Sequence, residues 1–225
     1  EIGVRLVGSE MCIRDRISTD QGICSYNYET EDFSRYQIKG NTKDDVCFLN
    51  TSDGMLLAAC SNGLYRYNEQ DSLFVPFLLD KEKPHVRYFA EDGDKTLWID
   101  TNKGLMRYSL EKKQFVSLPT LIQPFTQQCN NAVLISSNQL LFNTNNDFFV
   151  YHIQSNTLCN LSKDLEVKDF RCAATDHTGN IWVGTEYGIF VFNKLYQLIA
   201  HYEQSERDLS ALNDSPCLLY TSPSP

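Results

Sequence analysis

The sequence predicts an all-β fold built from a repeat of about 41 residues, and three observations support this. A turn position recurs at intervals of 41, 41, 43 and 41 residues, at Gly22, Gly63, Gly104, Asp147 and Gly188. An aromatic residue follows each turn by four positions, at Tyr26, Tyr67, Tyr108, Tyr151 and Phe192. Within each copy, side chains alternate with the period of a strand and not of a helix. A period near 40 made of short strands is typical of a β-propeller, whose blades have four strands each.

Each copy is expected to contribute four strands in order. The inner strands are predicted at 46–51, 86–91, 132–136 and 169–175. The second strands are predicted at 55–60, 96–101, 139–144 and 180–185. The third strand carries the aromatic column, and the fourth begins near an apolar position eleven residues after the turn. Turn sequences such as SDG at 52–54 and DHTGN at 176–180 separate the strands.

The spacing divides the chain into one partial blade and four complete four-stranded blades. The partial blade is expected at 17–40, and the complete blades are expected at 41–79, 80–118, 119–161 and 162–203. The blade at 119–161 opens with a long linker, and 204–216 is read as an inter-blade linker. A closed ring of seven such blades needs about 290 residues. We therefore predict a β-propeller fragment that forms an open arc and not a closed ring.

The strongest repeat positions have structural explanations. They are Thr19, Gly22, Gly63, Trp98, Thr101, Gly104, Thr144, Trp182, Thr185 and Gly188. The glycines supply a positive φ in a TxxG hairpin, and Asp is among the few residues tolerated there, as at position 147. A phosphate-binding glycine loop precedes a helix, whereas each glycine here precedes a strand. The tryptophans share their column with Leu57 and Leu141, which predicts packing between blades.

The two ends of the chain do not fit the repeat. Residues 8–15 (GSEMCIRD) and 217–225 (CLLYTSPSP) can be encoded by opposite strands of one DNA segment. Sequencing-library adapters have this property when translated, and the pair resembles the transposase-tagging kind. We therefore expect 1–16 and 217–225 to be adapter-like artefacts, which are set aside as a fusion scar would be. The remaining residues are expected to be a fragment of a longer gene product.

Composition excludes several classes of partner. The formal net charge is −9 and the basic residues are not clustered, which argues against nucleic acid and anionic membrane surfaces. No apolar run reaches 18 residues, so no membrane span is expected in this segment. Six cysteines lie between the two ends, with no CxxC and no metal-ligand spacing. We expect mainly free thiols, with a Cys47–Cys60 pair as the alternative, and we expect no metal and no cofactor.

One copy of the repeat resembles a known family. Residues 176–192 read D-x-x-G-N-I-W-V-G-T-x-x-G-I-x-x-F, which is similar to the two-component regulator propeller repeat found in the periplasmic sensor regions of hybrid two-component system histidine kinases. Residues 92–115 match nearly as well and depart at Asp100, where the family has Gly. The copies at 51–74 and 135–158 are more divergent.

The resemblance implies a role in signal transduction. Family members carry two seven-bladed propellers in the periplasm, followed by a β-sandwich, a membrane span, a histidine kinase, a receiver and a DNA-binding domain. Many respond to oligosaccharides. For this chain, the resemblance implies a periplasmic propeller with an oligosaccharide ligand. The implied protein partners are the remaining blades of the same chain and a homodimer of the full receptor.

Three functional hypotheses remain open on the residues. The first is a ligand-binding module. The second is a propeller glycosidase or lyase, which would need a pair of carboxylates on the inner strands; Glu91 is the only acidic residue in the predicted inner strands. The third is a protein-interaction or dimerisation scaffold. The missing carboxylate pair favours binding over catalysis, so we predict no catalytic residue in this segment.

A ligand face is predicted where the linkers into the inner strands meet the TxxG hairpins, because these loops converge on the mouth of a propeller channel. The long linker offers Phe125 with Gln127 and Gln128, an aromatic ring beside amides that suits a sugar. The starts of two inner strands add His85, Arg87, Tyr88 and Arg171. His152 and His177 are expected to be solvated.

Overall fold

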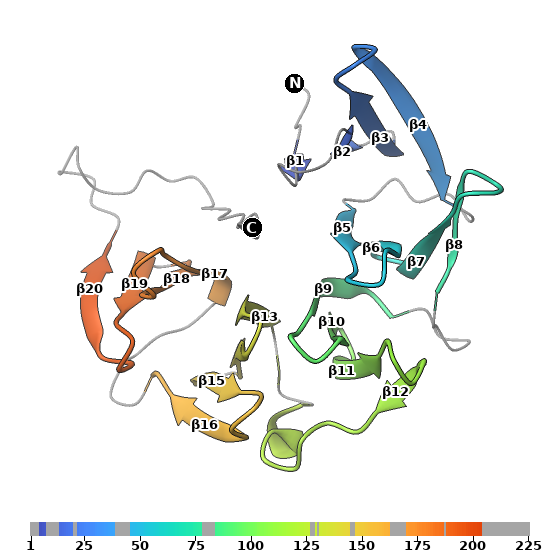
Figure 1. The fold of residues 1–225 in the computed structure, drawn as a ribbon. Helices are drawn as coiled ribbons and strands as arrows, with labels where there is room; N and C mark the ends of the chain where they lie inside the picture. Colours follow the sequence, from blue (N-terminus) through green and yellow to red (C-terminus); the bar gives the residue numbers. More distant parts are fainter. Residues whose placement is uncertain are drawn as a thin grey trace. The chain divides into compact units, whose positions relative to one another are not determined.

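The fold is all-β, as predicted. The structure, a computed structural model, describes residues 5–7, 14–19, 22–38, 46–77, 84–126, 129, 131–144, 147–162, 170–186 and 188–203. Side chains are described from Ile23 onward, apart from that of Gln37. These residues form twenty β-strands and one short 3-10 helix, η1 (Gln123–Phe125) (Figure 1).

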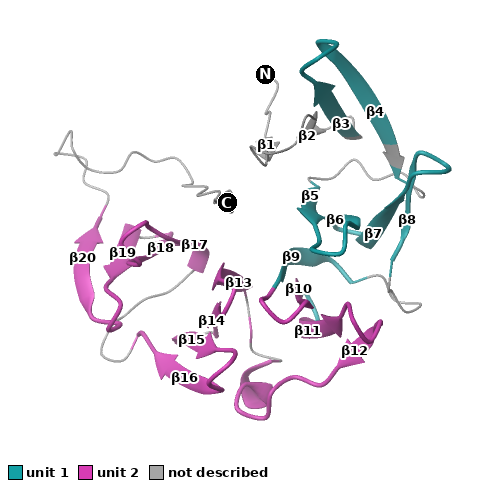
Figure 2. Cartoon of the chain, in the orientation of Figure 1, with its two compact units in different colours: residues 1–91, 101–103, 222–225 teal, residues 92–100, 104–221 magenta. Residues whose placement is uncertain are grey.

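The chain separates into two compact units (Figure 2). Unit 1 comprises residues 1–91, 101–103 and 222–225, and unit 2 comprises 92–100 and 104–221. The boundary follows β9 (Val86–Glu91), the first strand of the sheet ordered β12-β11-β10-β9. Each unit is described separately below.

Unit 1 contains two four-stranded meanders. The first consists of β1 (Arg5–Val7), β2 (Arg14–Thr19), β3 (Gly22–Asn27) and β4 (Asp32–Ile38). The second consists of β5 (Cys47–Asn50), β6 (Leu56–Cys60), β7 (Gly63–Asn68) and β8 (Leu73–Pro76). Each meander is antiparallel, and the outer strands β4 and β8 pair in parallel, which gives the continuous order β1-β2-β3-β4-β8-β7-β6-β5. Strands β1 and β2 extend backbone pairing into the segment 1–16 that was set aside.

Unit 2 repeats the same meander. Its first sheet contains β10 (Thr96–Thr101), β11 (Gly104–Ser109) and β12 (Gln114–Val116). The next contains β13 (Asn131–Ser136), β14 (Gln139–Asn143), β15 (Phe148–His152) and β16 (Thr157–Asn160). The last contains β17 (Phe170–Thr175), β18 (Ile181–Thr185), β19 (Gly188–Phe192) and β20 (Leu198–Tyr202). The strand positions in the four complete repeats agree with the sequence prediction to within one or two residues at each end.

The TxxG element is the hairpin between the second and third strands of each sheet, as predicted. Gly104 has a φ of +112° and Gly188 one of +138°, values that L side chains rarely adopt. A Cβ on Gly188 would lie 2.2 Å from the backbone oxygen of Tyr202, so the glycine also permits close approach of the chain. The hydroxyl of Thr185 closes the same turn on the oxygen of Gly188, at 3.0 Å. Thr19 and Gly22 pair across the corresponding turn of β2 and β3.

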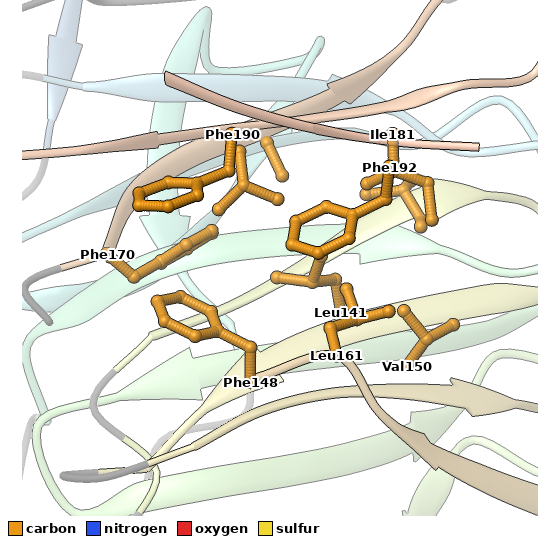
Figure 3. Close-up of a cluster of buried hydrophobic side chains, with 11 residues drawn as sticks. Leu141, Phe148, Val150, Leu161, Phe170, Ile181, Phe190 and Phe192 are labelled. Carbon is orange, nitrogen blue, oxygen red and sulfur yellow. The ribbon is translucent and has the colours of Figure 1, made fainter. Parts of the chain in front are cut away.

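The core of unit 2 lies between neighbouring sheets. Figure 3 shows one cluster, in which Leu141, Phe148 and Val150 from β14–β15 pack against Phe170, Ile181, Phe190 and Phe192 from the β17–β20 sheet. A second cluster joins Trp98 and Leu105 to Leu140, Phe142, Phe149 and Tyr151. Each sheet thus buries apolar side chains against the next, which is how propeller blades share a core. In unit 1, Ile23, Ala58, Tyr65 and Phe74 belong to a separate cluster.

Each of the two tryptophans makes the same kind of hydrogen bond, to an Asp six residues earlier in its repeat. The indole nitrogen of Trp98 donates to Oδ2 of Asp92 at 2.8 Å, and that of Trp182 donates to Oδ2 of Asp176 at 3.0 Å. The other carboxylate oxygen of each Asp accepts backbone N–H groups of the turn that follows the inner strand. Trp98 is buried, in agreement with the predicted packing between blades, whereas Trp182 is half-buried.

Cys24, Cys47, Cys60, Cys129, Cys159 and Cys172 are free thiols. Among the described residues, none of the helical segments has the length and apolar character needed to span a membrane.

Candidate functional site

The predicted ligand face corresponds to one end of each sheet, the end at which the inner strand begins. We call this end the inner-strand edge. It comprises the residues at the start of an inner strand and those of the TxxG hairpin beside it. In unit 1 the two parts are joined by hydrogen bonds. The backbone N–H of His85 donates to the side-chain oxygen of Asn102 at 3.1 Å, and the N–H of Asn102 donates to the oxygen of His85 at 3.0 Å.

Arg87 and Tyr88 lie further along β9. The Nη2 of Arg87 donates to the backbone oxygen of Thr101 at 2.8 Å, which holds the half-buried guanidinium against the hairpin. The imidazole of His85 is exposed, and Tyr88 is half-buried. His85, Arg87 and Tyr88 therefore lie within a single unit. The guanidinium of Arg87 is held there by the backbone oxygen of Thr101.

In unit 2 the inner-strand edge carries a charged pair. Nη2 of Arg171, at the start of β17, lies 3.3 Å from Oε2 of Glu186 in the β18–β19 hairpin, and both side chains are more than half exposed. The amide of Asn131, at the start of β13, donates to the backbone oxygen of Phe170 at 3.2 Å and so links two neighbouring sheets. Sequence reasoning missed Asn102, Glu186 and Asn131, because the hairpin partners of the strand starts become apparent only from the strand register.

The long linker holds Phe125 differently from the prediction. Phe125 ends η1, and its half-buried ring packs on Phe149 with a centroid distance of 4.8 Å and near Phe142 at 6.1 Å. Part of the ring is therefore used by the core of unit 2. Gln127 and Gln128 lie outside the described residues, so the aromatic–amide pair stays a prediction. The predicted site residues are divided between the units, with His85, Arg87 and Tyr88 in one and Phe125 and Arg171 in the other.

Two departures from the repeat have structural roles. The carboxylate of Asp100 is 1% exposed, and its Oδ2 accepts the backbone N–H of Ala132 at 3.3 Å, which ties β10 to the inner strand of the next sheet. The carboxylate of Asp147 accepts hydrogen bonds from Asn160 and Ser162, at 2.9 and 3.0 Å. The neighbouring turn residues 145–146 lie outside the described residues. Both acids are thus held by the fold.

Glu91 remains the only acidic residue in the described inner strands β5, β9, β13 and β17. Its carboxylate accepts the backbone N–H of Ser52 at 2.7 Å and also the hydroxyl of that serine. A carboxylate held in this way links the end of β9 to the turn between β5 and β6. The second carboxylate that glycoside hydrolysis needs is not supplied by these strands. No group of three or more metal-ligating side chains occurs among the residues that the structure describes.

The carboxyl group of Asp176 has a strongly perturbed acidity. Hydrogen bonds from the hydroxyl of Thr178 and the indole of Trp182 hold its pKa well below the usual range, because they stabilise the ionised form. The backbone and side chain of Asn180 add to this effect. Asp176 is therefore a structural anion that fixes the β17–β18 turn, and not a general acid.

The expectation for His152 is wrong. The ring is half-buried, and its Nε2 makes a short hydrogen bond to the hydroxyl of Tyr196, which also accepts a hydrogen bond from Gln139 Nε2 at 3.1 Å. Tyr196 comes from the β19–β20 turn and packs against the core of the neighbouring β13–β16 sheet. The sequence places these partners far apart, so a solvated histidine was the simpler interpretation. His177 is exposed, as expected.

Comparison with known proteins defines the fold. Neither a family model nor a curated protein matches the chain. Among solved structures, the extracellular domain of BT3049 from B. thetaiotaomicron, assigned as a hybrid two-component system, matches with a TM-score of 0.65 at 15% identity over 90% of this chain. The corresponding domain of BT4673 from the same organism gives 0.68 at 15% identity over 87%. This chain spans 28% and 29% of those two structures.

An enzyme shares the fold as well. Virginiamycin B lyase from Staphylococcus aureus, in a catalytically inactive form with quinupristin, matches with a TM-score of 0.65 at 14% identity, over 90% of this chain and 70% of the lyase. At such identities the likeness establishes architecture and not activity. The repeat in the sequence and the similarity to these structures agree. The chain is a segment of β-propeller blades.

Proposed function

We propose that this chain is part of the ligand-sensing propeller of a bacterial hybrid two-component receptor, that it lies in the periplasm, and that its ligand is an oligosaccharide. The observation that carries the proposal is the repeat at 176–192, whose residues resemble the two-component regulator propeller motif. The likeness of the fold to extracellular domains of hybrid two-component systems supports it. We place the ligand at the inner-strand edge of unit 2.

The inner-strand edge has chemistry that suits a hydroxylated ligand. In unit 2, Arg171 is exposed there beside Glu186, and its guanidinium offers hydrogen-bond donors to a ligand oxygen. Exposed ion pairs such as Arg171–Glu186 contribute little to stability, about 0–1 kcal/mol. Arg171 can therefore exchange Glu186 for a ligand oxygen at small cost. Binding would act on the other blades and domains of the receptor, and no chemical step is assigned to this segment.

The test uses the full-length protein in its host, with a transcriptional reporter and oligosaccharide digests of plant and storage polysaccharides as probes. Arg171→Ala should weaken the response about 10-fold or more, the loss expected for a direct polar contact. Glu186→Gln removes the same ion pair and keeps Arg171, so it is the matched control for a merely structural effect. Lys194→Ala, an exposed change in the β19–β20 turn, should have no effect. An unaltered response in Arg171→Ala would remove the assignment.

The likeness to a lyase supports an enzymatic alternative, in which the propeller cleaves its ligand. The structural use of Glu91 and the lack of a second inner-strand carboxylate in the described strands weigh against a hydrolase of the acid–base kind. Incubation of the full-length protein with the same digests and analysis of the products by mass spectrometry distinguishes the two. Stoichiometric binding without new products supports the sensor, and catalytic turnover supports the alternative.

A further inference from the structure

The β6–β7 hairpin (Figure 1) contains the only Asn-Gly dipeptide of the chain, at Asn62 and Gly63. Its loop has two residues, Ser61 and Asn62, between the paired ends Cys60 and Gly63. Asn62 is exposed, whereas Gly63 is buried. Asparagine is one of the chemically labile residues of proteins, and a following glycine makes it most reactive because no side chain shields the backbone nitrogen. The proposed function gives this dipeptide no role.

The fold itself requires the glycine at position 63. Gly63 has a φ of +119°, in the region that L side chains rarely adopt. Gly104, at the same place in the β10–β11 hairpin, has a φ of +112°. The residue before Gly104 is Lys103, which carries no amide side chain. The repeat therefore fixes the glycine, and Asn62 turns one copy of a structural turn into a reactive pair.

The β6–β7 hairpin is also closed less firmly than a repeat that keeps the threonine. In the β18–β19 hairpin, the hydroxyl of Thr185 donates to the oxygen of Gly188 at 3.0 Å. Cys60 replaces that threonine in the β6–β7 hairpin, and its Sγ lies 3.7 Å from the oxygen of Gly63. A thiol is a weak hydrogen-bond donor compared with a hydroxyl. The Cys60–Gly63 pair is the last of its ladder, and pairs at the end of a ladder open at a smaller free-energy cost than central ones.

Opening of this terminal pair frees the nitrogen that reacts. The backbone nitrogen of Gly63 forms a bond to Cγ of Asn62, and its proton passes to solvent. The Cγ–Nδ2 bond of Asn62 breaks, and the amide nitrogen leaves as ammonia. Water then opens the five-membered succinimide ring at either carbonyl, which gives aspartate or isoaspartate. The exposure of Asn62 admits the water and the base, and the adjacent positions of the two groups make the attack intramolecular.

We propose that Asn62 is a site of spontaneous deamidation in the folded protein, and that closure of the β6–β7 hairpin sets its rate. Both products place a carboxylate in the loop and add one negative charge to the formal −9. Isoaspartate also lengthens the main chain by one carbon in a two-residue loop, which the present pairing of Cys60 with Gly63 does not accommodate. The hairpin thus changes charge and shape with age. This chemistry needs no ligand and is independent of the sensing role.

The test incubates the full-length protein at mildly alkaline pH and physiological temperature. Peptide mass spectrometry follows the conversion of the amide at Asn62 to a carboxylate, and chromatography separates isoaspartate from aspartate. Asn102, which is followed by Lys103 in the β10–β11 hairpin, is the internal reference. Asn62 should convert about 10-fold faster than Asn102 or more, because the side chain of Lys103 hinders attack by its backbone nitrogen.

Two variants separate the dipeptide from the hairpin that holds it. Asn62→Gln keeps an amide at the same position but requires a six-membered ring, so conversion there should be lost. Cys60→Thr restores the hydroxyl of the repeat and should slow conversion in the folded protein several-fold, without lowering the melting temperature. In urea, where the hairpin is unfolded, Cys60→Thr and the unmodified chain should convert at the same rate.

The proposal is overturned if Asn62 stays intact in the folded protein while the urea-unfolded protein converts, or if Asn62 converts no faster than Asn102. It is also overturned if Cys60→Thr leaves the folded-state rate unchanged. Should Cys60→Thr fail to fold, the first two comparisons decide. Since the proposed function is measured as a transcriptional response to changes at Arg171, its failure and that of the present proposal are distinguishable.

Discussion

Trp98 on β10 and Trp182 on β18 occupy the same repeat position, and each bonds an Asp six residues upstream, yet their surroundings differ. Trp98 is 1% exposed because the next sheet covers it, with Tyr151 at 6.1 Å between ring centroids. Trp182 is half-buried and stacks instead on Tyr202 of its own sheet, at 6.2 Å with nearly parallel planes. A repeat therefore specifies the local bond, and the neighbouring blade supplies the burial. Substitutions at the two equivalent positions can separate these two contributions.

Removing the two indoles should give unequal losses of stability. Trp98→Ala is expected to lower the free energy of unfolding by about 4 kcal/mol, because it leaves a cavity between two sheets. Trp182→Ala should lower it by about 2 kcal/mol, because part of that ring already contacts solvent. Urea denaturation followed by circular dichroism measures both. Equal losses would mean that a further blade covers Trp182 as the β13–β16 sheet covers Trp98.

The hairpin glycines of the same two sheets should also respond unequally. Gly188→Ala combines a disfavoured φ with a Cβ placed 2.2 Å from a backbone oxygen, whereas at Gly104 the nearest atom, the backbone oxygen of Thr126, lies 2.7 Å away. We expect losses of about 3 kcal/mol and about 2 kcal/mol, respectively. The same denaturation experiment reads them out. The opposite order would show that the linker around η1 yields less readily than β20.

The Asp partners should follow the burial of their tryptophans. Asp92→Ala leaves the indole N–H of Trp98 buried without an acceptor, at a cost of about 2 kcal/mol. Asp176→Ala should cost less, because water can reach the half-buried Trp182 and replace the carboxylate. Melting temperatures of the two variants, measured side by side, test this order. Asp92→Asn, which can keep an acceptor oxygen, is the control that should restore part of the loss.

The fold could be predicted from the sequence to a large extent, because its determinants are local. The Trp98–Asp92 and Trp182–Asp176 bonds join residues of one hairpin, and the TxxG turn carries its own backbone preference. The site could not be predicted to the same extent. The bond between Tyr196 and His152 spans 44 positions, and it depends on which side chain of the next repeat reaches back. Asn156, in the equivalent turn of the β13–β16 sheet, accepts a hydrogen bond from Tyr151 of its own sheet instead, so the same turn position has different partners in the two repeats.

Acid should affect the β17–β18 turn only at low pH. The folded-state pKa of Asp176 is lowered, so the stabilisation that its ionised form provides is fully present above about pH 4, the ordinary pKa of an aspartate. It is lost as the pH falls from there through the lowered value. In a melting series from pH 7 to pH 3, Asp176→Asn should lose less stability than the unmodified protein between pH 4 and pH 3. Identical slopes would show that the hydrogen bonds from Thr178 and Trp182 do not favour the charged form.

The chain contains only two tryptophans, and their unequal burial makes them natural fluorophores for two different sheets. Trp98, shielded from water, should emit at shorter wavelength than the half-exposed Trp182. A single-tryptophan variant would isolate either signal. The opening of one blade interface could then be followed in time and told apart from that of the other, without an attached label.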